Sequence, residues 1–487
     1  MTNKPNILWI CTDQQRYDTI GALNNPYVST PNIDKLMREG VAFDYAYCQS
    51  PICTPSRASF LTGMYPSIVH ATRNGNRAMP ADHPPLVTKL LADQGYDCGL
   101  IGKLHLSSAY GRIEQRTDDG YRYWQYSHAP RDDWAEGHDY ADWVREQGYV
   151  LGELTKSLDG VPAPLHQTTW CAEKTIAFIS EQRNAETPWL ASVNIYDPHP
   201  PFNPPREYRE QFNPDDMPGP LFLESDIAQQ QALQAIDFQS KVRRPDELDI
   251  PNPIVPRTPG TDRDSESAGG RDGRTLQAAY YAMIKLIDDQ VGRILQALDE
   301  TGQRGNTIII FTSDHGETLG DHGLIQKGCR FYEGLVRIPL IISWPERFQA
   351  NVVSPALVEL TDLAPTLLEA AGQSVPTHMQ GRSLLPLLTG NAPLDDHRYF
   401  VRSEYFDTLD QPAASYATMY RDRQHKLVVY HGTGLGELYD MVADPDEFEN
   451  RWNDEAMMEV KMDLLLRSFD ASMFGGIDVG TERIGPM

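Results

Sequence analysis

Along the first part of the chain, short runs of apolar residues alternate with segments whose apolar residues recur every three or four positions. The uninterrupted runs are typical of strands that are buried on both faces, and the longer periodic segments are typical of helices. The strands are predicted at residues 6–11, 96–103, 188–195 and 307–312, and the helices at 32–40, 84–94 and 276–298. This alternation predicts the α/β class, with a large mixed, mostly parallel sheet that helices cover on both faces as an α/β/α sandwich.

The end of the chain follows a different pattern. Three short strands are predicted at residues 399–404, 417–421 and 425–430, and a closing helix is predicted at 455–469. Because no helix separates these strands, we expect a smaller C-terminal antiparallel sheet plus helix. The chain is therefore divided into a large domain at 1–392 and a C-terminal α+β subdomain with a tail at 393–487.

Two segments lack periodicity. Residues 203–275 form an irregular excursion, and within it 241–275 are rich in Pro, Gly, Asp, Arg and Ser, a composition that favours loops. The tail from Phe474 to Met487 is rich in glycine. One hypothesis is that this tail reaches a neighbouring subunit of a homo-oligomer, and the alternative is a tail without regular structure.

Composition excludes several classes of partner. The 487 residues include 43 Lys plus Arg and 68 Asp plus Glu, and the net charge of −25 argues against nucleic acid or an anionic membrane. No run approaches the ~20 apolar residues of a membrane span, and the early strand at 6–11 leads us to expect no signal peptide. The six cysteines have no metal-type spacing, so we expect free thiols and a cytoplasmic location.

Polar residues stand at the ends of four predicted strands. In a parallel sheet the carboxyl ends of the strands share one edge, and ligands bind beyond that edge. The residues at these ends are Asp13 for the first strand, Lys103 and His105 for the second, His199 for the third, and Asp314 with His315 for the fourth. We therefore expect residues that are distant in sequence to form one site.

Two of these acidic residues can hold a cation between them. Asp13 alone has an ordinary interpretation, which is the capping of the next helix. Asp314, however, follows a second strand and can bind the same ion. Carboxylate oxygens suit Ca²⁺, Mg²⁺ or Mn²⁺, and the adjacent His315 widens the choice to Mn²⁺ or Zn²⁺.

The segment Cys53-Thr54-Pro55-Ser56-Arg57 resembles the signature of type I sulfatases. Further motifs follow the order found in the sulfatase branch of the alkaline phosphatase superfamily: Asp13-Gln14, Gly102-Lys103-Leu104-His105, Asp197-Pro198-His199, Asp314-His315-Gly316, Lys327 and a C-terminal stretch from Gly434 to Asn450. The resemblance spans residues 6 to about 450. It points to the sub-branch near choline sulfatases and phosphonate monoester hydrolases, and it makes 1–392 the catalytic domain.

The resemblance implies that a formylglycine-generating enzyme oxidises Cys53 to formylglycine, whose hydrated aldehyde is the nucleophile. It also implies one divalent metal held by Asp13, Gln14, Asp314 and His315, with residue 53 as a further ligand. Many family members have Asp where this chain has Gln14, and Asn where it has His315. These departures lower the negative charge of the site. Calcium is the first expectation for the metal, and manganese or zinc are the alternatives.

The resemblance also supplies the cations that a sulfate ester requires. Lys103, Lys327 and Arg57 bring positive charge to the sulfate, and Arg57 holds the Cys53 loop in place. The residues expected to bind substrate are Asn74, Lys103, His199 and Lys327. The Asn-Gly sequence at Asn74 is equally typical of a simple turn, so both interpretations stay open.

Proton transfers complete the implied reaction. Asp314 takes a proton from the hydrated aldehyde, and His199 or Lys327 protonates the leaving oxygen. His105 deprotonates the remaining hydroxyl, so that the sulfate is expelled and the aldehyde reforms. Three other histidines have no motif around them and stay unassigned: His128, His138 and His166.

We therefore predict hydrolysis of a sulfate ester to an alcohol and inorganic sulfate. The alternative is a phosphonate monoester or phosphodiester hydrolase with the same site, because these esters are similar in shape and the family is promiscuous between them. The regular segment 55–57 favours the sulfatase. A third hypothesis, a non-catalytic scaffold that binds a metal or an anion, conflicts with the complete set of motif residues. The expected partners are a small anionic sulfate ester, the formylglycine-generating enzyme and a second copy of the chain.

Overall fold

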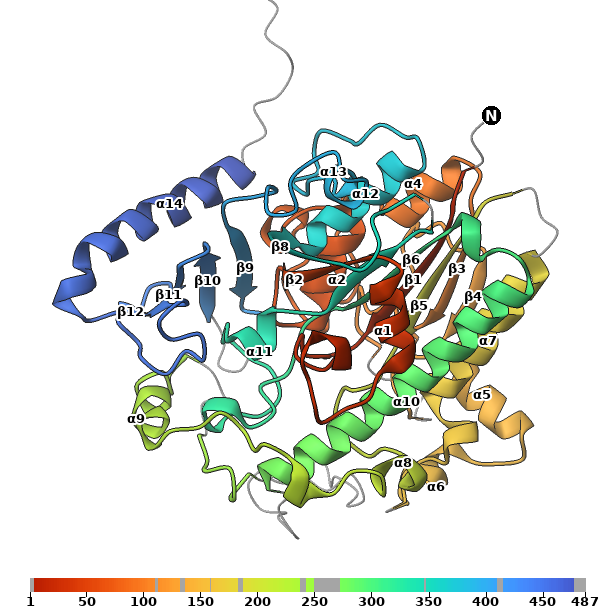
Figure 1. The fold of residues 1–487 in the computed structure, drawn as a ribbon, viewed down its shortest axis with the longest axis horizontal. Coiled ribbons are helices and arrows are strands. Elements are labelled where there is room, and N and C mark those ends of the chain that lie inside the picture. Colours follow the sequence, from red (N-terminus) through yellow and green to blue (C-terminus); the bar gives the residue numbers. More distant parts are fainter. Residues whose placement is uncertain are drawn as a thin grey trace, which may run out of the picture.

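The computed structural model describes most of the chain (Figure 1). The described residues are 4–109, 113–131, 136–157, 159–182, 187–236, 242–248, 272–345, 347–409 and 415–476. Residues 477–487 of the predicted tail and 249–271 of the predicted excursion lie outside these ranges. Within the described ranges, no helix combines the length and the apolar character needed to cross a membrane.

A sheet of eight strands forms the centre of the molecule, in the order β4-β3-β5-β1-β6-β7-β2-β8. The strands are β1 (Asn6–Thr12), β2 (Val41–Tyr47), β3 (Asp97–Gly102), β4 (Tyr123–Tyr126), β5 (Trp189–Ile195), β6 (Thr307–Ser313), β7 (Leu340–Ser343) and β8 (Val352–Glu359). Neighbouring strands run parallel except for the two pairs that involve β7. The prediction of a mixed, mostly parallel sheet is confirmed.

Helices cover both faces of this sheet, as the alternation of side chains along β1 requires (Figure 1). Ile7 and Trp9 of β1 belong to the apolar core on one face, and Leu8 and Ile10 belong to the core on the other. The helices are α2 (Cys53–Thr62), α4 (Val87–Asp93) and α12 (Leu363–Ala370) on the first face, and α1 (Pro31–Arg38), α5 (Asp139–Glu146), α7 (Gln167–Glu181) and α10 (Gly273–Glu300) on the second. This arrangement is the predicted α/β/α sandwich.

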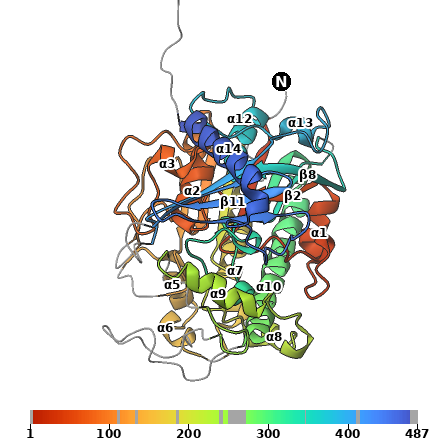
Figure 2. The same cartoon turned by 90° about the vertical axis from the view of Figure 1, so that its left-hand side faces the viewer.

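A second, antiparallel sheet has the order β12-β11-β10-β9, and α14 (Met458–Gly476) crosses it (Figure 2). Its strands are β9 (Val401–Phe406), β10 (Tyr416–Arg421), β11 (His425–Tyr430) and β12 (Leu435–Asp440). Leu464 and Ala471 of α14 pack with Leu427 and Leu438 in an apolar cluster. The predicted smaller sheet and helix are confirmed, whereas the division of the chain after residue 392 stays a prediction.

The other α-helices of the described ranges have four to nine residues: α3 (Pro66–Val69), α6 (Leu151–Leu154), α8 (Arg206–Arg209), α9 (Glu224–Ala232), α11 (Glu333–Val336) and α13 (Leu385–Leu388).

Several elements differ from the sequence expectation. β2, β4, β7, β8 and β12 lie outside the predicted strands. β8 contains Pro355, which is tolerated because β8 is an edge strand, and β2 contains Asp44 at a shift of register. The segment that begins at Cys53, expected as a loop, is the first turn of α2. All ten residues of α2 are buried although half of them are polar, so its apolar and polar residues do not separate into an inner and an outer face that a periodic pattern could reveal.

A buried ion cluster joins β11 of the second sheet to α11. Lys426 of β11 is fully buried, and its Nζ lies 2.7 Å from Glu333 Oε1 and 2.7 Å from Glu447 Oε1. Burial acts to raise the pKa of Glu333, but Lys426 and Arg421 outweigh it and lower that pKa to about 2. The stabilisation from Glu333 is present above its ordinary pKa of 4.5 and is lost as the pH falls through about 2, whereas burial raises the pKa of Glu447 to about 6, which opposes that stabilisation at neutral pH.

Replacing Lys426 by alanine is expected to lower the free energy of unfolding by about 3–5 kcal/mol, because Glu333 and Glu447 lose the cation between them while they stay buried. Urea denaturation followed by tryptophan fluorescence measures this change. The matched control is Lys156→Ala, since Lys156 pairs with Glu153 on the surface, where such a pair is worth less than about 1 kcal/mol. Equal losses in the two variants would contradict a stabilising role for the cluster.

Candidate active site

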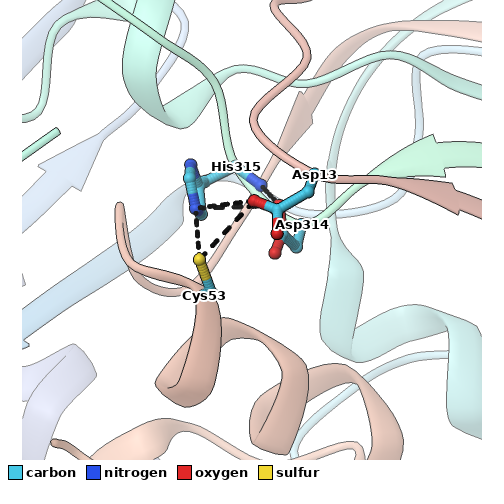
Figure 3. Close-up of side chains that lie close together, drawn as sticks. All are labelled: Asp13, Cys53, Asp314 and His315. Atoms are coloured by element: carbon cyan, nitrogen blue, oxygen red, sulfur yellow. Dashed lines mark hydrogen bonds and ion pairs between the residues drawn. The ribbon is translucent and has the colours of Figure 1, made fainter. Parts of the chain in front are cut away.

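Four side chains from three elements meet at the carboxyl edge of the large sheet (Figure 3). Asp13 follows β1, Asp314 and His315 follow β6, and Cys53 is the first residue of α2. The parallel register of β1 with β6 brings the two aspartates side by side. One potential ligand atom from each of the four residues lies within 4.8 Å of the others, and all four side chains are buried.

The donor atoms of this cluster suit a divalent cation. Cys53 Sγ lies 3.1 Å from His315 Nε2 and 3.6 Å from Asp13 Oδ1. His315 Nε2 lies 3.7 Å from Asp314 Oδ1, and its Nδ1 lies 2.9 Å from the Gly316 carbonyl oxygen. The ring proton therefore belongs on Nδ1, which leaves the lone pair of Nε2 facing the cluster. Burial lowers the pKa of His315 to about 4, so the ring is neutral at pH 7.

Arg57 ties α2 to the ends of three strands. Its guanidinium donates to Asp314 Oδ2 at 2.8 Å, to the Lys103 carbonyl at 2.9 Å and to Asn194 Oδ1 at 3.2 Å. Ser56 Oγ donates to the Asp314 carbonyl at 2.5 Å. Arg57 thus holds a helical turn, not a loop, against the strand ends. Its assignment to catalysis stays a prediction.

Two ammonium groups flank the sulfur of Cys53. Lys327 Nζ lies 2.8 Å from Cys53 Sγ, and Lys103 Nζ lies 3.8 Å from the same atom and forms an ion pair with Asp13. Burial acts to raise the pKa of Asp13, but nearby cations, Lys103 foremost, outweigh it and hold that pKa well below its usual range. Burial, with the charge of Asp13 second, raises the pKa of the Cys53 thiol. The sulfur is therefore a neutral thiol at pH 7.

The rings of His105 and His199 are both neutral at pH 7. Desolvation and the Lys103 charge lower the pKa of His105 well below its usual range, and desolvation and the Lys327 charge do the same to His199. A neutral imidazole can accept a proton, as the predicted role of His105 requires. The His105 ring also contacts the ring of His128 at right angles, with a centroid distance of 4.5 Å.

Gln14 lies beside the cluster in a left-handed backbone conformation with φ of 71°. Its N–H donates to Asp314 Oδ1 at 3.1 Å, and its carbonyl accepts from the Tyr280 hydroxyl at 2.6 Å. The side-chain Nε2 donates to Glu317, whereas the buried Oε1 has no hydrogen-bond partner among the described residues. A buried amide oxygen without a partner is costly unless a ligand satisfies it, so Gln14 fits the predicted cation.

Asn74 lies beside the first turn of α2. Thr54 Oγ1 donates to Asn74 Oδ1 at 2.9 Å, and the N–H of Asn74 donates to the Thr408 carbonyl at 2.9 Å. The adjacent Arg73 pairs with Asp407, so this loop is anchored to the segment that follows β9. The position is compatible with a substrate contact and with a simple turn.

Sequence patterns missed the proximity of His128 to the site. The Ser127 N–H donates to the Gly102 carbonyl at 3.1 Å, which continues the pairing of β3 with β4 and brings His128 to the common edge. Its place after a strand was the available signal, but β4 is four residues long and half exposed. His138 and His166 accept backbone N–H groups at the N-termini of α5 and α7, which is a structural role.

Comparison with protein families agrees with this site. A family model described as sulfatase matches residues 5–373. The chain belongs to the sulfatase family. A second model, for the C-terminal region of N-sulphoglucosamine sulphohydrolase, matches residues 320–471 of this sulfatase.

Individual relatives cover almost the whole sulfatase. An arylsulfatase of Clostridium perfringens is 29% identical over 94% of this chain and 92% of its own length. The multifunctional alkaline phosphatase superfamily protein PehA of Trinickia caryophylli is 31% identical over 94% of this chain and 92% of its own length. The solved phosphonate monoester hydrolase of Agrobacterium radiobacter has a TM-score of 0.79 and 27% identity, covering 97% of this chain and 96% of its own. The predicted family, fold and class of sulfuric ester hydrolase are confirmed.

Replacing Tyr280 by phenylalanine in this sulfatase is expected to lower the free energy of unfolding by about 1–3 kcal/mol. The buried Gln14 carbonyl and Arg16 N–H both lose their partner, the Tyr280 hydroxyl. Chemical denaturation measures the loss. Tyr123→Phe is the control, because that half-buried hydroxyl makes one 3.4 Å hydrogen bond to the Lys174 carbonyl and should cost under about 0.5 kcal/mol. If the control costs as much, the Tyr280 hydroxyl does not support Gln14.

Proposed function

We propose that this sulfatase hydrolyses a small sulfate ester to an alcohol and inorganic sulfate, with formylglycine formed from Cys53 as nucleophile and one divalent cation. The observation that carries the proposal is the position of Cys53 Sγ at the edge of a buried donor cluster, 2.8 Å from one ammonium group and 3.8 Å from another. An anionic group attached at this position meets positive charge on two sides.

The state of Cys53 supports oxidation rather than direct use of the thiol. Burial keeps the thiol protonated, and a protonated thiol is a poor nucleophile. Its sulfur stands where an oxygen of the formylglycine hydrate would stand. Since Cys53 is only 1% exposed, the formylglycine-generating enzyme has to act before α2 packs into the fold.

Asp13, Gln14, Asp314 and His315 would hold the cation, with residue 53 completing the set. When bound, the cation brings positive charge to the sulfate oxygens and lowers the pKa of a coordinated hydroxyl. The carboxylate and amide oxygens favour Ca²⁺, while the nitrogen of His315 keeps Mn²⁺ and Zn²⁺ as alternatives.

The proposal assigns the proton transfers to side chains of the site. Asp314 takes a proton from a hydroxyl of the hydrated aldehyde as the oxygen of that hydroxyl attacks sulfur. Lys103 and Lys327 attract the sulfate oxygens. His199 protonates the alcohol oxygen as the bond from sulfur to that oxygen breaks. His105 then takes the proton of the remaining hydroxyl, the bond from carbon to the sulfate oxygen breaks, and the aldehyde reforms with release of sulfate. Water adds to the aldehyde and restores the hydrate.

A phosphonate monoester or phosphodiester hydrolase is the second candidate. The structural similarity to the Agrobacterium radiobacter phosphonate monoester hydrolase and the 31% sequence identity to the multifunctional PehA protein favour this hydrolase as the alternative. Both classes of ester present tetrahedral anionic oxygens, so we expect promiscuity between them.

Four broader assignments belong to the same proposal. We place the protein in the cytoplasm, since all six cysteines are free and buried. We propose maturation by a formylglycine-generating enzyme, a homo-oligomer, and a catalytic domain that ends near residue 392.

The proposal predicts faster turnover of an aryl sulfate than of a phosphonate monoester or a phosphate diester with the same phenol. Mass spectrometry of the peptide that contains residue 53 gives the oxidised fraction, and all rates are normalised to it. Cys53→Ala is expected to lower turnover by about 10³-fold or more, as loss of a nucleophile does in other hydrolases. Faster turnover of the phosphorus esters would transfer the conclusion to the second candidate, and an active Cys53→Ala variant would refute the nucleophile.

His199→Ala is expected to slow hydrolysis of an alkyl sulfate by about 10²–10⁴-fold and that of 4-nitrophenyl sulfate far less, because a good leaving group needs no proton. The negative charge of a bound ester raises the pKa of His199 and lets the ring carry the proton. His105→Ala is the comparison: His105 acts after the alcohol has left, on an intermediate that both esters share, so this variant should bring the two turnover numbers toward a common value and slow the aryl ester at least as much as the alkyl ester. A uniform loss in His199→Ala would show that His199 is not the acid.

A further inference from the structure

Glu317 is a fully buried carboxylate two residues beyond His315, and the proposed reaction gives it no role. Its Oε2 accepts a hydrogen bond from Gln14 Nε2. Its Oε1 accepts the backbone N–H of Leu319, at 3.1 Å, and that of Gln326. Each of these partners is a donor, so both oxygens of Glu317 serve as acceptors.

The contact with Gln14 decides how that amide is oriented. An amide has an acceptor oxygen at one end and a donor nitrogen at the other, and a cation binds only the oxygen. Because a carboxylate accepts hydrogen bonds, the NH₂ end of Gln14 faces Glu317, and Oε1 lies at the opposite end. That oxygen is buried and has no partner among the residues that the structure describes.

The main chain of Gln14 is fixed as well. A φ of 71° is uncommon outside glycine and persists only where the surroundings impose it. Asp314 accepts the N–H of Gln14, and Tyr280 donates to its carbonyl. The remaining freedom is that of the side chain, and Glu317 is the group that restricts it.

We propose that Glu317 is a positioning residue for the cation site: by holding the NH₂ end of Gln14, it presents Gln14 Oε1 as a ligand beside Asp13 and Asp314. This inference rests on the proposed function, since it assumes the cation.

The same carboxylate reaches the other side of the site. Gln326, whose N–H donates to Glu317, directly precedes Lys327. Lys327 Nζ lies 2.8 Å from Cys53 Sγ. Glu317 therefore connects the amide ligand with the segment that carries the ammonium group.

Glu317→Gln tests this role, because glutamine keeps the shape of the side chain but has one acceptor oxygen instead of two. It can satisfy Gln14 or the two backbone N–H groups, but not both. We expect the affinity for Ca²⁺ and for Mn²⁺ to fall about 10- to 100-fold, the effect typical of residues that orient metal ligands. Calorimetric titration of the chelator-treated full chain with CaCl₂ or MnCl₂ measures this without substrate and without formylglycine.

Glu114→Gln is the matched control. Glu114 is also a buried carboxylate that accepts two backbone N–H groups, those of His105 at 2.7 Å and Leu106 at 3.0 Å, but it lies on the proton-transfer side of the site. Its substitution should change the cation affinity by less than about twofold, as expected for an independent site.

An exchange of the two side chains separates positioning from folding. In the double variant Gln14→Glu with Glu317→Gln, the new amide can donate to the new carboxylate and accept the two backbone N–H groups, so every contact is restored. We expect this variant to fold and to recover the affinity of the unaltered protein. Gln14→Glu alone places two buried carboxylates face to face and should bring no gain, because like charges repel.

Three results would overturn the inference: unchanged affinity in Glu317→Gln, a double variant that binds no better than Glu317→Gln, or Gln14→Glu alone binding as tightly as the double variant. If the unaltered protein binds neither cation, the cation of the proposed function fails together with the inference. If it binds a cation and the exchange has no effect, the proposed function stands and only the role of Glu317 is lost.

Discussion

Asp13 and Asp314 are two buried carboxylates at the carboxyl ends of adjacent strands, and the surrounding structure has to balance their charge. A buried ion without a partner costs several kcal/mol, so each carboxylate needs a cation at close range. Lys103 pairs with Asp13, and Arg57 Nε lies 2.8 Å from Asp314 Oδ2. These cations are themselves only 2% and 1% exposed. Removing either a cation or a carboxylate would therefore leave its partner as an unpaired buried charge. The position of α2 follows from this pairing, because Arg57 belongs to its second turn.

The same constraint explains which parts of the protein could be predicted from the sequence. Strands β1 and β6 are buried on both faces, so they appear as uninterrupted apolar runs, and their ends locate Asp13 and Asp314. β4 is half exposed at one edge of the sheet, and β8 carries Pro355 at the other, so neither gives a periodic pattern. The position of His128 after β4 was lost with that strand.

Two further features could not be predicted for different physical reasons. The helical state of Cys53 has no signature in the sequence, because α2 is buried on every side and its polar residues are buried as well as its apolar ones. The contact between Gln14 and Glu317 joins residues 303 positions apart. Only the register of β1 with β6 in the folded sheet brings the two residues together. Local propensities describe neighbours in the sequence and cannot predict such a contact. The sequence motifs could indicate the type of chemistry. They could not indicate the hydrogen bonds that hold each functional group in place.

The charge of the site differs from the charge of the surface. Acidic surface groups are screened beyond about 8–10 Å at physiological ionic strength, so the net charge of −25 has little effect on a buried centre. Near Cys53, the cations Arg57, Lys103 and Lys327 face the carboxylates Asp13 and Asp314, and the histidines are neutral. The side chains closest to Cys53 therefore carry an excess of positive charge, which a bound divalent cation increases. Such a charge suits an anionic ester, whether a sulfate, a phosphonate monoester or a phosphate diester. It follows that charge alone does not separate the two candidate reactions, and that the choice depends on groups which contact the leaving alcohol.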